Sequence, residues 1–264
     1  MNKGAIMMIT CENCGKEQSP GNFCESCGAP LEAQTERTVT DNQTLEKVKQ
    51  QSSQYWAYAV ERIKNPTIAL KDGSESFANA VITAILLPLF LSILLYALAN
   101  NVVQQQMSMF TDGRSLPFFL IVSRLFIFFV ILLFTGLIAS AISLKIAKNR
   151  TSFQMLFTRF SGLQVPYTMV YVVLALLALA GIFSLNLNSF GNNVPMFVLL
   201  NVIFVILTVI HPVILTYSHV KQEEHPHAYY MTILSFVINL LILYIFTFVL
   251  LDGMLRSLEQ MFMW

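Results

Sequence analysis

The chain has 264 residues, of which 55% are hydrophobic and 12% are charged, with 21 phenylalanines and a net charge of +1. A soluble globular domain of this length does not carry so apolar a composition, which is typical of a protein embedded in a lipid bilayer. The first ten residues hold one lysine and a short apolar patch, so the features of a cleaved signal peptide are lacking. We therefore expect the N-terminal segment to stay on the synthesising side of the membrane.

All cysteines of the chain lie near its beginning, in two Cys-x-x-Cys pairs that are each followed by glycine: Cys11, Cys14, Cys24 and Cys27. Four thiolates suit the tetrahedral coordination of Zn²⁺, and the glycine relieves the backbone of each turn. Alternative interpretations are two disulfides, a redox Cys-x-x-Cys motif and an iron centre of rubredoxin type. The turn over residues 19–22 offers no strand-to-helix junction of the kind a redox motif uses. The spacing predicts a zinc ribbon over residues 8–31.

The predicted zinc is structural, because four protein ligands leave no open position for water. A module this small cannot hold together by apolar burial, so metal binding would supply its folding free energy. Its thiols need a reducing compartment, which places the N-terminus in the cytosol. Lys16 is its only basic residue, against Glu12, Glu17 and Glu25. We therefore expect a cytosolic or membrane protein as its partner, and no nucleic acid.

Residues 32–43 are polar and aperiodic, and we expect them to form a linker. Apolar or small residues then recur every three or four positions, which predicts an amphipathic juxtamembrane helix over residues 44–65. Its Tyr55, Trp56 and Tyr58 suit the headgroup layer of a membrane. Three roles stay open for this helix: docking on the membrane surface, packing on the membrane domain, and self-association, which would produce a homo-oligomer.

Five apolar runs follow, each long enough to cross a bilayer: residues 77–99, 125–144, 167–185, 196–217 and 229–251. They predict an all-α polytopic membrane protein with five transmembrane helices over residues 75–251 and an outward tail over residues 252–264. Pro88 in the first run predicts a kink rather than a break. Lysine and arginine collect before the first run and in the second connection, which places the N-terminus in the cytosol and the C-terminus outside. We therefore expect a multi-pass protein of the plasma membrane.

The connection after the second run has a basic turn and then an apolar helical face, which predicts a surface helix between two spans. This region resembles the corresponding part of bacterial Yip-type membrane proteins, and the residues that carry the resemblance are Phe153, Phe157, Pro166 and Tyr167. The resemblance covers about residues 75–250 and implies five spans with a cytosolic N-terminus. The whole chain also resembles zinc-ribbon multi-span proteins of Bacillus-like bacteria, which implies architecture more than activity.

All four histidines lie between residues 211 and 227, at the end of the fourth run and in the loop after it. His211 and Pro212 lie in apolar sequence, where the proline frees the carbonyl of Thr208. A structural kink and a proton or substrate relay are the two interpretations of that pair. A second metal site, a pH-responsive loop and an ordinary solvated turn are the interpretations for His219, His225 and His227.

No Gly-x-Ser-x-Gly, His-Glu-x-x-His or phosphate-loop motif occurs, and no Asp or Glu lies inside a predicted span. We therefore assign no catalytic residue and expect a non-enzymatic membrane protein that organises or regulates a membrane process through its zinc ribbon. The alternative is a small-solute permease or transporter subunit, with the ribbon as a regulatory or assembly element. Dry packing around small residues such as Gly136 and Ser140 favours the first, and a wet path past Asn201, His211 and Asn239 favours the second. A metal sensor, the third interpretation, requires exchangeable zinc.

Overall fold

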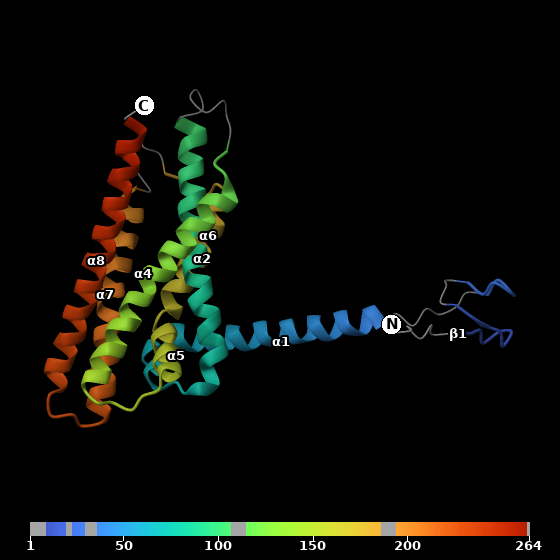
Figure 1. Ribbon diagram of the computed structural model, residues 1–264, viewed down its shortest axis with the longest axis horizontal. Helices are drawn as coiled ribbons and strands as arrows, with labels where there is room; N and C mark the ends of the chain where they lie inside the picture. The colour runs from blue at the N-terminus through green and yellow to red at the C-terminus, as the bar shows by residue number, and fades with distance from the viewer. Residues whose placement is uncertain (1–8, 20–22, 30–35, 107–114, 186–193, 263–264) are drawn as a thin grey trace, which may run out of the picture. The chain divides into compact units, whose positions relative to one another are not determined.

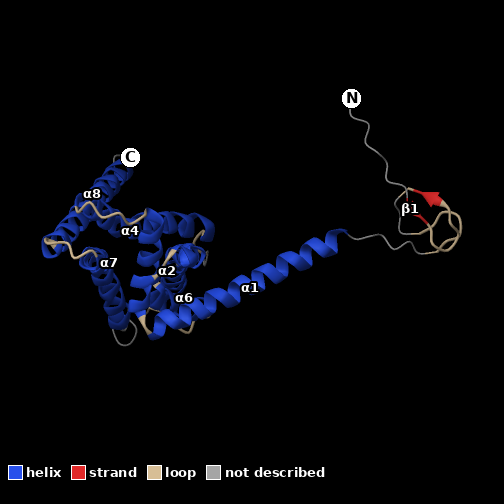
Figure 2. Cartoon of the chain, turned by 90° about the horizontal axis from the view of Figure 1, so that it is seen from below, coloured by secondary structure: helices blue, strands red, loops and turns tan. Residues whose placement is uncertain are grey.

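The computed structural model describes residues 9–19, 23–29, 36–106, 115–185 and 194–262. They fall into two compact units, residues 1–54 and 55–264. Within the described residues, strand occurs only in the cysteine-bearing part of the first unit, and helix dominates elsewhere (Figure 2). The strands β1 (Ile9–Thr10) and β2 (Glu17–Gln18) pair antiparallel, with Thr10 opposite Glu17.

The helix α1 (Glu36–Lys64) differs from the prediction at its start, because residues 36–43 were expected to be linker. These residues are polar but contain neither glycine nor proline, and helix propagation needs no apolar face. The end of α1 agrees with the prediction, because Pro66 disfavours a helical conformation for the residue before it. Two short 3₁₀ helices follow, η1 (Pro66–Lys71) and η2 (Ser74–Ser76).

The second unit is a bundle of long apolar helices, as the sequence predicts (Figure 1). Among the described residues, four helices are long and apolar enough to cross a membrane on their own: α2 (Phe77–Gln106), α4 (Phe118–Ile146), α7 (Val194–Gln222) and α8 (Ala228–Phe262). The helix α2 continues through Pro88, in agreement with the expected absence of a break. The chain is therefore an all-α polytopic membrane protein.

The predicted third span differs from the structure. The helix found there, α6 (Val165–Leu179), ends before the predicted end at 185 and meets the preceding helix α5 (Phe153–Leu163) at an angle of 51°. The helix α6 has 15 residues and rises only about 22 Å, which is short of a hydrocarbon core of about 30 Å. A fifth span therefore requires both helices. The last helix also differs, because α8 continues to Phe262 through most of the predicted tail at 252–264.

The core of the bundle lies where α2 packs on α6 and α4. Leucines at positions 87, 91, 94 and 98 recur on one face of α2 and are almost wholly buried. They pack with Tyr171 and Ala175 of α6 and with Phe129 of α4. Over residues 228–249, where the exposure of α8 is described, most of its apolar side chains are exposed, which suits contact with lipid. This bundle positions the polar groups described below.

Two segments expected at the membrane surface are partly buried in the second unit. The predicted surface helix is α5, but its Leu156, Phe157 and Phe160 are buried against neighbouring helices. Tyr55 and Tyr58 of α1 are likewise buried, beside Val165. Of the three roles that the sequence left open for this helix, the burial of these tyrosines agrees with packing on the membrane domain.

Candidate metal centre and juxtamembrane ion pair

The two Cys-x-x-Cys segments fold into nearly identical turns. The Gly15 N–H donates to the Cys11 carbonyl at 2.7 Å, and the Gly28 N–H donates to the Cys24 carbonyl at 2.9 Å. Gly15 and Gly28 have φ values of 68° and 70°, a left-handed conformation that glycine adopts without steric cost. The glycine after each pair therefore has the role that the sequence predicts.

The four cysteine sulfurs converge on one point. Their Sγ atoms all lie within 4.8 Å of one another, with Cys11 and Cys27 at 3.7 Å and Cys14 and Cys24 at 3.6 Å. A tetrahedral Zn–S bond of about 2.3 Å gives an S–S edge of about 3.8 Å. All four thiols are free of disulfides. The residues present therefore fit a metal ion with four thiolate ligands.

The pKa values of the thiols depend on the backbone and sulfur groups around them. Backbone N–H groups of Cys27 and Ser26 lower the pKa of the Cys24 thiol to about 6. At Cys14 the Lys16 backbone N–H lowers the pKa, but the neighbouring thiols of Cys27 and Cys24 raise it to about 12 overall. The neighbouring thiols thus lower the pKa of Cys24 and raise that of Cys14. A bound cation would favour the thiolate form at every one of these sulfurs.

Outside the sulfurs, the module has little to hold it together. Cys11 and Cys24 are its buried apolar side chains among the described residues, with Ala29 packed beside them. Two polar side chains link its two halves: Gln18 donates to the Phe23 carbonyl and accepts from the Glu25 N–H, and Asn13 donates to Cys27 Sγ. A core this small leaves metal binding as the main source of folding free energy.

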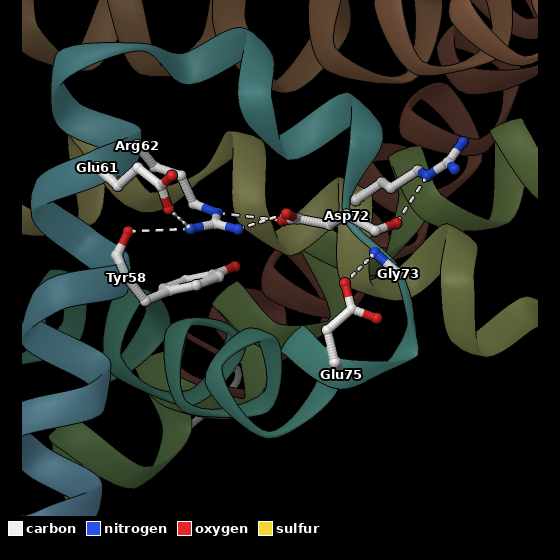
Figure 3. Close-up of polar contacts among 7 residues, drawn as sticks. Tyr58, Glu61, Arg62, Asp72, Gly73 and Glu75 are labelled. Atoms are coloured by element: carbon white, nitrogen blue, oxygen red, sulfur yellow. Dashed lines mark hydrogen bonds and ion pairs between the residues drawn. The ribbon is translucent and has the colours of Figure 1, made fainter.

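A second polar cluster lies where α1 meets the membrane domain (Figure 3). Arg62 donates from Nε to Asp72 Oδ2 at 3.1 Å, and from Nη2 to Asp72 Oδ1. Its Nη1 donates to the Tyr58 carbonyl at 3.1 Å, and the guanidinium lies 3.5 Å from the centroid of the Tyr58 ring. Arg62 is only 3% exposed. This bidentate buried pair fixes the end of α1 to the segment before α2.

The helix α5 completes this cluster from the other side. Arg159 donates from Nε to the Asp72 backbone carbonyl at 3.0 Å. A Cβ atom on Gly162 would lie 2.9 Å from the Ala69 Cβ and 3.0 Å from Asp72 Oδ2. Glycine at this position therefore permits the close approach of α5 to η1. Burial raises the pKa of the Asp72 carboxyl, and the Arg62 charge opposes that rise.

Comparison with known proteins identifies the family of the membrane part. The model of the domain of unknown function DUF6574 matches residues 46–256, most of the chain. The chain belongs to the DUF6574 family. It is also 32% identical over 165 residues to the "Uncharacterized protein YvbI" of Bacillus subtilis (strain 168). That match covers 62% of this chain and 66% of the relative, just under two thirds of its length.

The family match begins after the cysteines and includes the ion pair. No Yip-family model matches the chain. No solved structure gives a significant match to the chain. The DUF6574 domain thus includes Arg62, Asp72 and Arg159, while the metal centre lies outside it.

Inside the DUF6574 domain, the polar groups near His211 are bonded to one another. The Tyr167 hydroxyl lies 3.0 Å from His211 Nδ1, and the two rings stack. The Thr208 carbonyl, which Pro212 frees from its helical bond, accepts from Asn239 Nδ2 at 3.4 Å. The sequence located this carbonyl but not its partner, because Asn239 lies on a different helix.

The other three histidines do not come together in the DUF6574 domain. His219 is buried within α7, with Nδ1 at 2.8 Å from the Leu215 carbonyl and Nε2 at 3.0 Å from Arg159 Nη1. Both of its ring nitrogens are therefore engaged. His225 and His227 lie beside each other in the turn before α8. Within the described residues, the four cysteines are the group whose ligand atoms are close enough for a metal ion.

Proposed function

We propose that this protein is a non-enzymatic membrane protein that organises or regulates a membrane process by binding a protein partner through its N-terminal zinc ribbon. The observation that carries the proposal is the convergence of four thiols within 4.8 Å. A closed four-thiolate site has no position for a reacting water. Its bound metal would therefore maintain a binding surface instead of performing a reaction.

Zinc is the metal that the proposal assigns to this site. Cytosolic four-cysteine sites with short turns favour zinc, which is redox-inert and has no preferred geometry beyond that of its ligands. Iron would fit the same sulfur tetrahedron, and metal analysis separates the two. A ribbon held by zinc would keep its shape through redox changes that alter an iron centre.

The exposed surface of the ribbon supports a protein partner with basic character. Phe23 lies between the two turns and is 65% exposed, and large exposed aromatic rings are enriched at protein interfaces. Glu12, Glu17 and Glu25 are also exposed, against the single base Lys16. This charge would repel a nucleic-acid backbone and attract lysine or arginine side chains.

The membrane domain supports a role without transport. Asn201 donates to the Phe197 carbonyl of its own helix at 2.8 Å, and Ser140 donates to the Pro212 carbonyl at 3.2 Å. The cavities at α4–α8, α4–α5 and η1–α7 do not include Asn201, His211 or Asn239. Polar groups that bond to neighbouring backbone favour packing between helices.

The proposal also places the N-terminus in the cytosol. The thiols require reducing conditions. Among the described residues, the bundle end that carries α5 and the α7–α8 turn has Lys71, Lys145, Lys148, Arg150 and Lys221, while Arg124 lies near the start of α4. Positive charge is typical of the cytoplasmic side. Reporter fusions to the C-terminus, active only in one compartment, test this orientation.

Two measurements test the proposed function in sequence. Metal analysis of the purified full chain should give one zinc per chain, and much less than one zinc would refute the ribbon. Crosslinking in native membranes should then recover a partner with the wild type but not with Cys11→Ser/Cys14→Ser. Ser26→Ala, which changes an exposed side chain of the same module and leaves every sulfur in place, is the matched control. Equal recovery by the cysteine variant would refute docking by the ribbon.

A further inference from the structure

A groove of about 430 Å³ lies between η1 and the last turns of α7. The last turns of α7, which line it, lie at the end of the bundle that also carries α5 and the turn into α8 (Figure 1). The side chains that line it are Leu70, Ile214, Tyr217, Ser218, Lys221 and Gln222. The metal centre and the Arg62–Asp72 pair do not contribute side chains to it.

The groove changes from apolar to polar along α7. Leu70 and Ile214 line its apolar part, while Lys221 and Gln222 line its polar part. Ile214 and Gln222 are separated by about 12 Å of helix rise, and the headgroup layer of a bilayer is roughly 6 Å deep on each side. We take the end of α7 at Gln222 to lie at the level of the headgroups. The polar part of the groove then lies at that level, and the apolar part extends towards the acyl chains.

With α7 placed in this way, Lys221 lies at the level of the headgroups. Its Nζ lies 5.4 Å from the centroid of the Tyr217 ring, a distance at which the ring face attracts the ammonium group. Tyrosine is itself enriched at the membrane interface. Within the described residues, no carboxylate lies within ion-pair distance of Lys221.

Arg159 provides a second cation beside the groove. Its Nη1 donates to Gln222 Oε1 at 3.4 Å, and Gln222 lines the groove. The same Nη1 lies 3.0 Å from His219 Nε2. Because His219 Nδ1 faces the Leu215 carbonyl, Nδ1 carries the proton and Nε2 accepts from Arg159. The Asp72 backbone carbonyl accepts from Nε.

All three hydrogen-bond acceptors of Arg159 are uncharged, and the Asp72 carboxylate acts on its charge only through space. The carboxylate of Asp72 is bonded to Arg62, and only the backbone carbonyl of Asp72 faces Arg159. Arg159 Nη2 has no hydrogen-bond partner within the described part of the chain. A guanidinium held in this way is oriented for an anion before the anion arrives.

We propose that this groove binds an anionic phospholipid from the surrounding leaflet. Lys221 and Arg159 bind the phosphate, Ser218 and Gln222 bond to the headgroup, and an acyl chain lies along Leu70 and Ile214. A soluble phosphate would use the cations but not the apolar part. An acidic peptide would likewise leave the apolar part in contact with lipid tails.

Native mass spectrometry of the full chain in detergent tests the proposal, with phosphatidylglycerol and phosphatidylcholine as probes. The wild type should retain phosphatidylglycerol in preference to phosphatidylcholine. Lys221→Gln should weaken that retention about fivefold, as expected for the loss of one lysine near an anionic headgroup. Lys145→Gln is the matched control, because Lys145 is exposed at the same end of the bundle but does not line the groove. Equal loss in both variants would overturn the proposal in favour of general surface charge.

A second variant tests the acyl-chain half without changing charge. Ile214 is 39% exposed, and Ile214→Trp should fill the apolar part of the groove and reduce retention of phosphatidylglycerol. Unchanged retention in this variant would refute the assigned acyl position. Glycerol phosphate and a polyglutamate peptide serve as soluble competitors. Displacement of the lipid by either competitor at equal concentration would overturn the assignment of a lipid ligand.

Discussion

Replacement of Arg62 by methionine should destabilise the membrane domain through the carboxylate that it leaves behind. The side chains of Arg62 and Asp72 are 4% and 6% exposed, so Asp72 would lose both of its charge-assisted bonds without gaining water in return. Removal of one partner of a buried ion pair lowers the free energy of unfolding by about 3–5 kcal/mol. Methionine keeps much of the apolar stem that lies against the Tyr58 ring, so little of this loss comes from packing.

The loss should depend on pH in a defined direction. Burial already raises the pKa of Asp72, and Arg62 opposes that rise. Removal of Arg62 therefore moves the folded-state pKa further above the unfolded value. A group with a raised folded pKa stabilises the fold below its unfolded pKa, and this contribution disappears as pH rises through the folded pKa. The variant should thus regain part of its lost stability at lower pH, where Asp72 is protonated.

Unfolding of the detergent-solubilised chain by sodium dodecyl sulfate, followed by far-UV circular dichroism, measures both effects at about pH 7.5 and about pH 5.5. Glu61→Gln is the control, because Glu61 is 57% exposed and also bonds to Arg62. That exposed contact is worth at most about 1 kcal/mol. A loss in Arg62→Met no larger than in the control, or a loss that is independent of pH, would contradict the buried-pair argument.

Three further outcomes follow from close contacts and from the thiols. Gly162→Ala should lower the free energy of unfolding by about 1–3 kcal/mol, because its Cβ would overlap Ala69; the same denaturation assay measures it, and a stabilised variant would contradict the packing. Chelation should make all four thiols reactive towards a chromogenic disulfide while the helical circular dichroism signal is retained, and loss of the helical signal would show that the two units unfold together. Tyr167→Phe should cost about 1 kcal/mol by loss of the bond to His211; a larger loss would show that this hydroxyl supports more than one neighbour.

The membrane helices could be predicted from the sequence because apolar runs are local features, but their ends could not. The helix α2 continues seven residues past the predicted end at Ala99, to Gln106. The polar side chains there make bonds of their own, such as that from the Leu116 N–H to Asn100 Oδ1. Backbone hydrogen bonds do not depend on hydropathy, so a change from apolar to polar side chains does not by itself end a helix.

The bend in the third span shows a different limit. The hydropathy of residues 167–185 predicts one straight span, but Pro166 lacks the N–H that would continue the ladder from α5. The Gln164 N–H bonds to the Ser161 carbonyl instead, which tightens the last turn of α5. Gly181, with a φ of 74°, follows the other end of α6. Pro166 and Gly181 thus lie at the two ends of α6, whereas the apolar residues beyond Gly181 extend the predicted span to residue 185.

The cysteine cluster was predictable because paired Cys-x-x-Cys turns are a recognisable ligand pattern, whereas the polar cluster around Asp72 was not. Arg62 and Asp72 are only ten residues apart, but they belong to no such pattern. Each Cys-x-x-Cys pair forms a local turn, and only one long-range step brings the pairs together. Arg159 instead bonds to Asp72 across 87 residues of sequence, which no local pattern reveals. One signal was present: Asp72 is an acidic residue next to a long apolar span, where a charge needs a partner.

The two units of the chain depend on different stabilising forces, and this separation bears on how the protein would act. The DUF6574 domain buries leucines and a paired arginine, and none of these contacts requires a metal. The cysteine module has a minimal core, so its shape would follow the occupancy of its metal site. Under the proposed function, loss of the metal would abolish partner binding while the membrane domain stays folded. A site that binds zinc tightly would stay occupied under cellular conditions, so partner binding would be constant. A site that binds zinc weakly would fill and empty with the zinc concentration, so partner binding would report that concentration. The zinc dissociation constant of the full chain, compared with the zinc concentration at which the partner crosslinks, distinguishes these two cases.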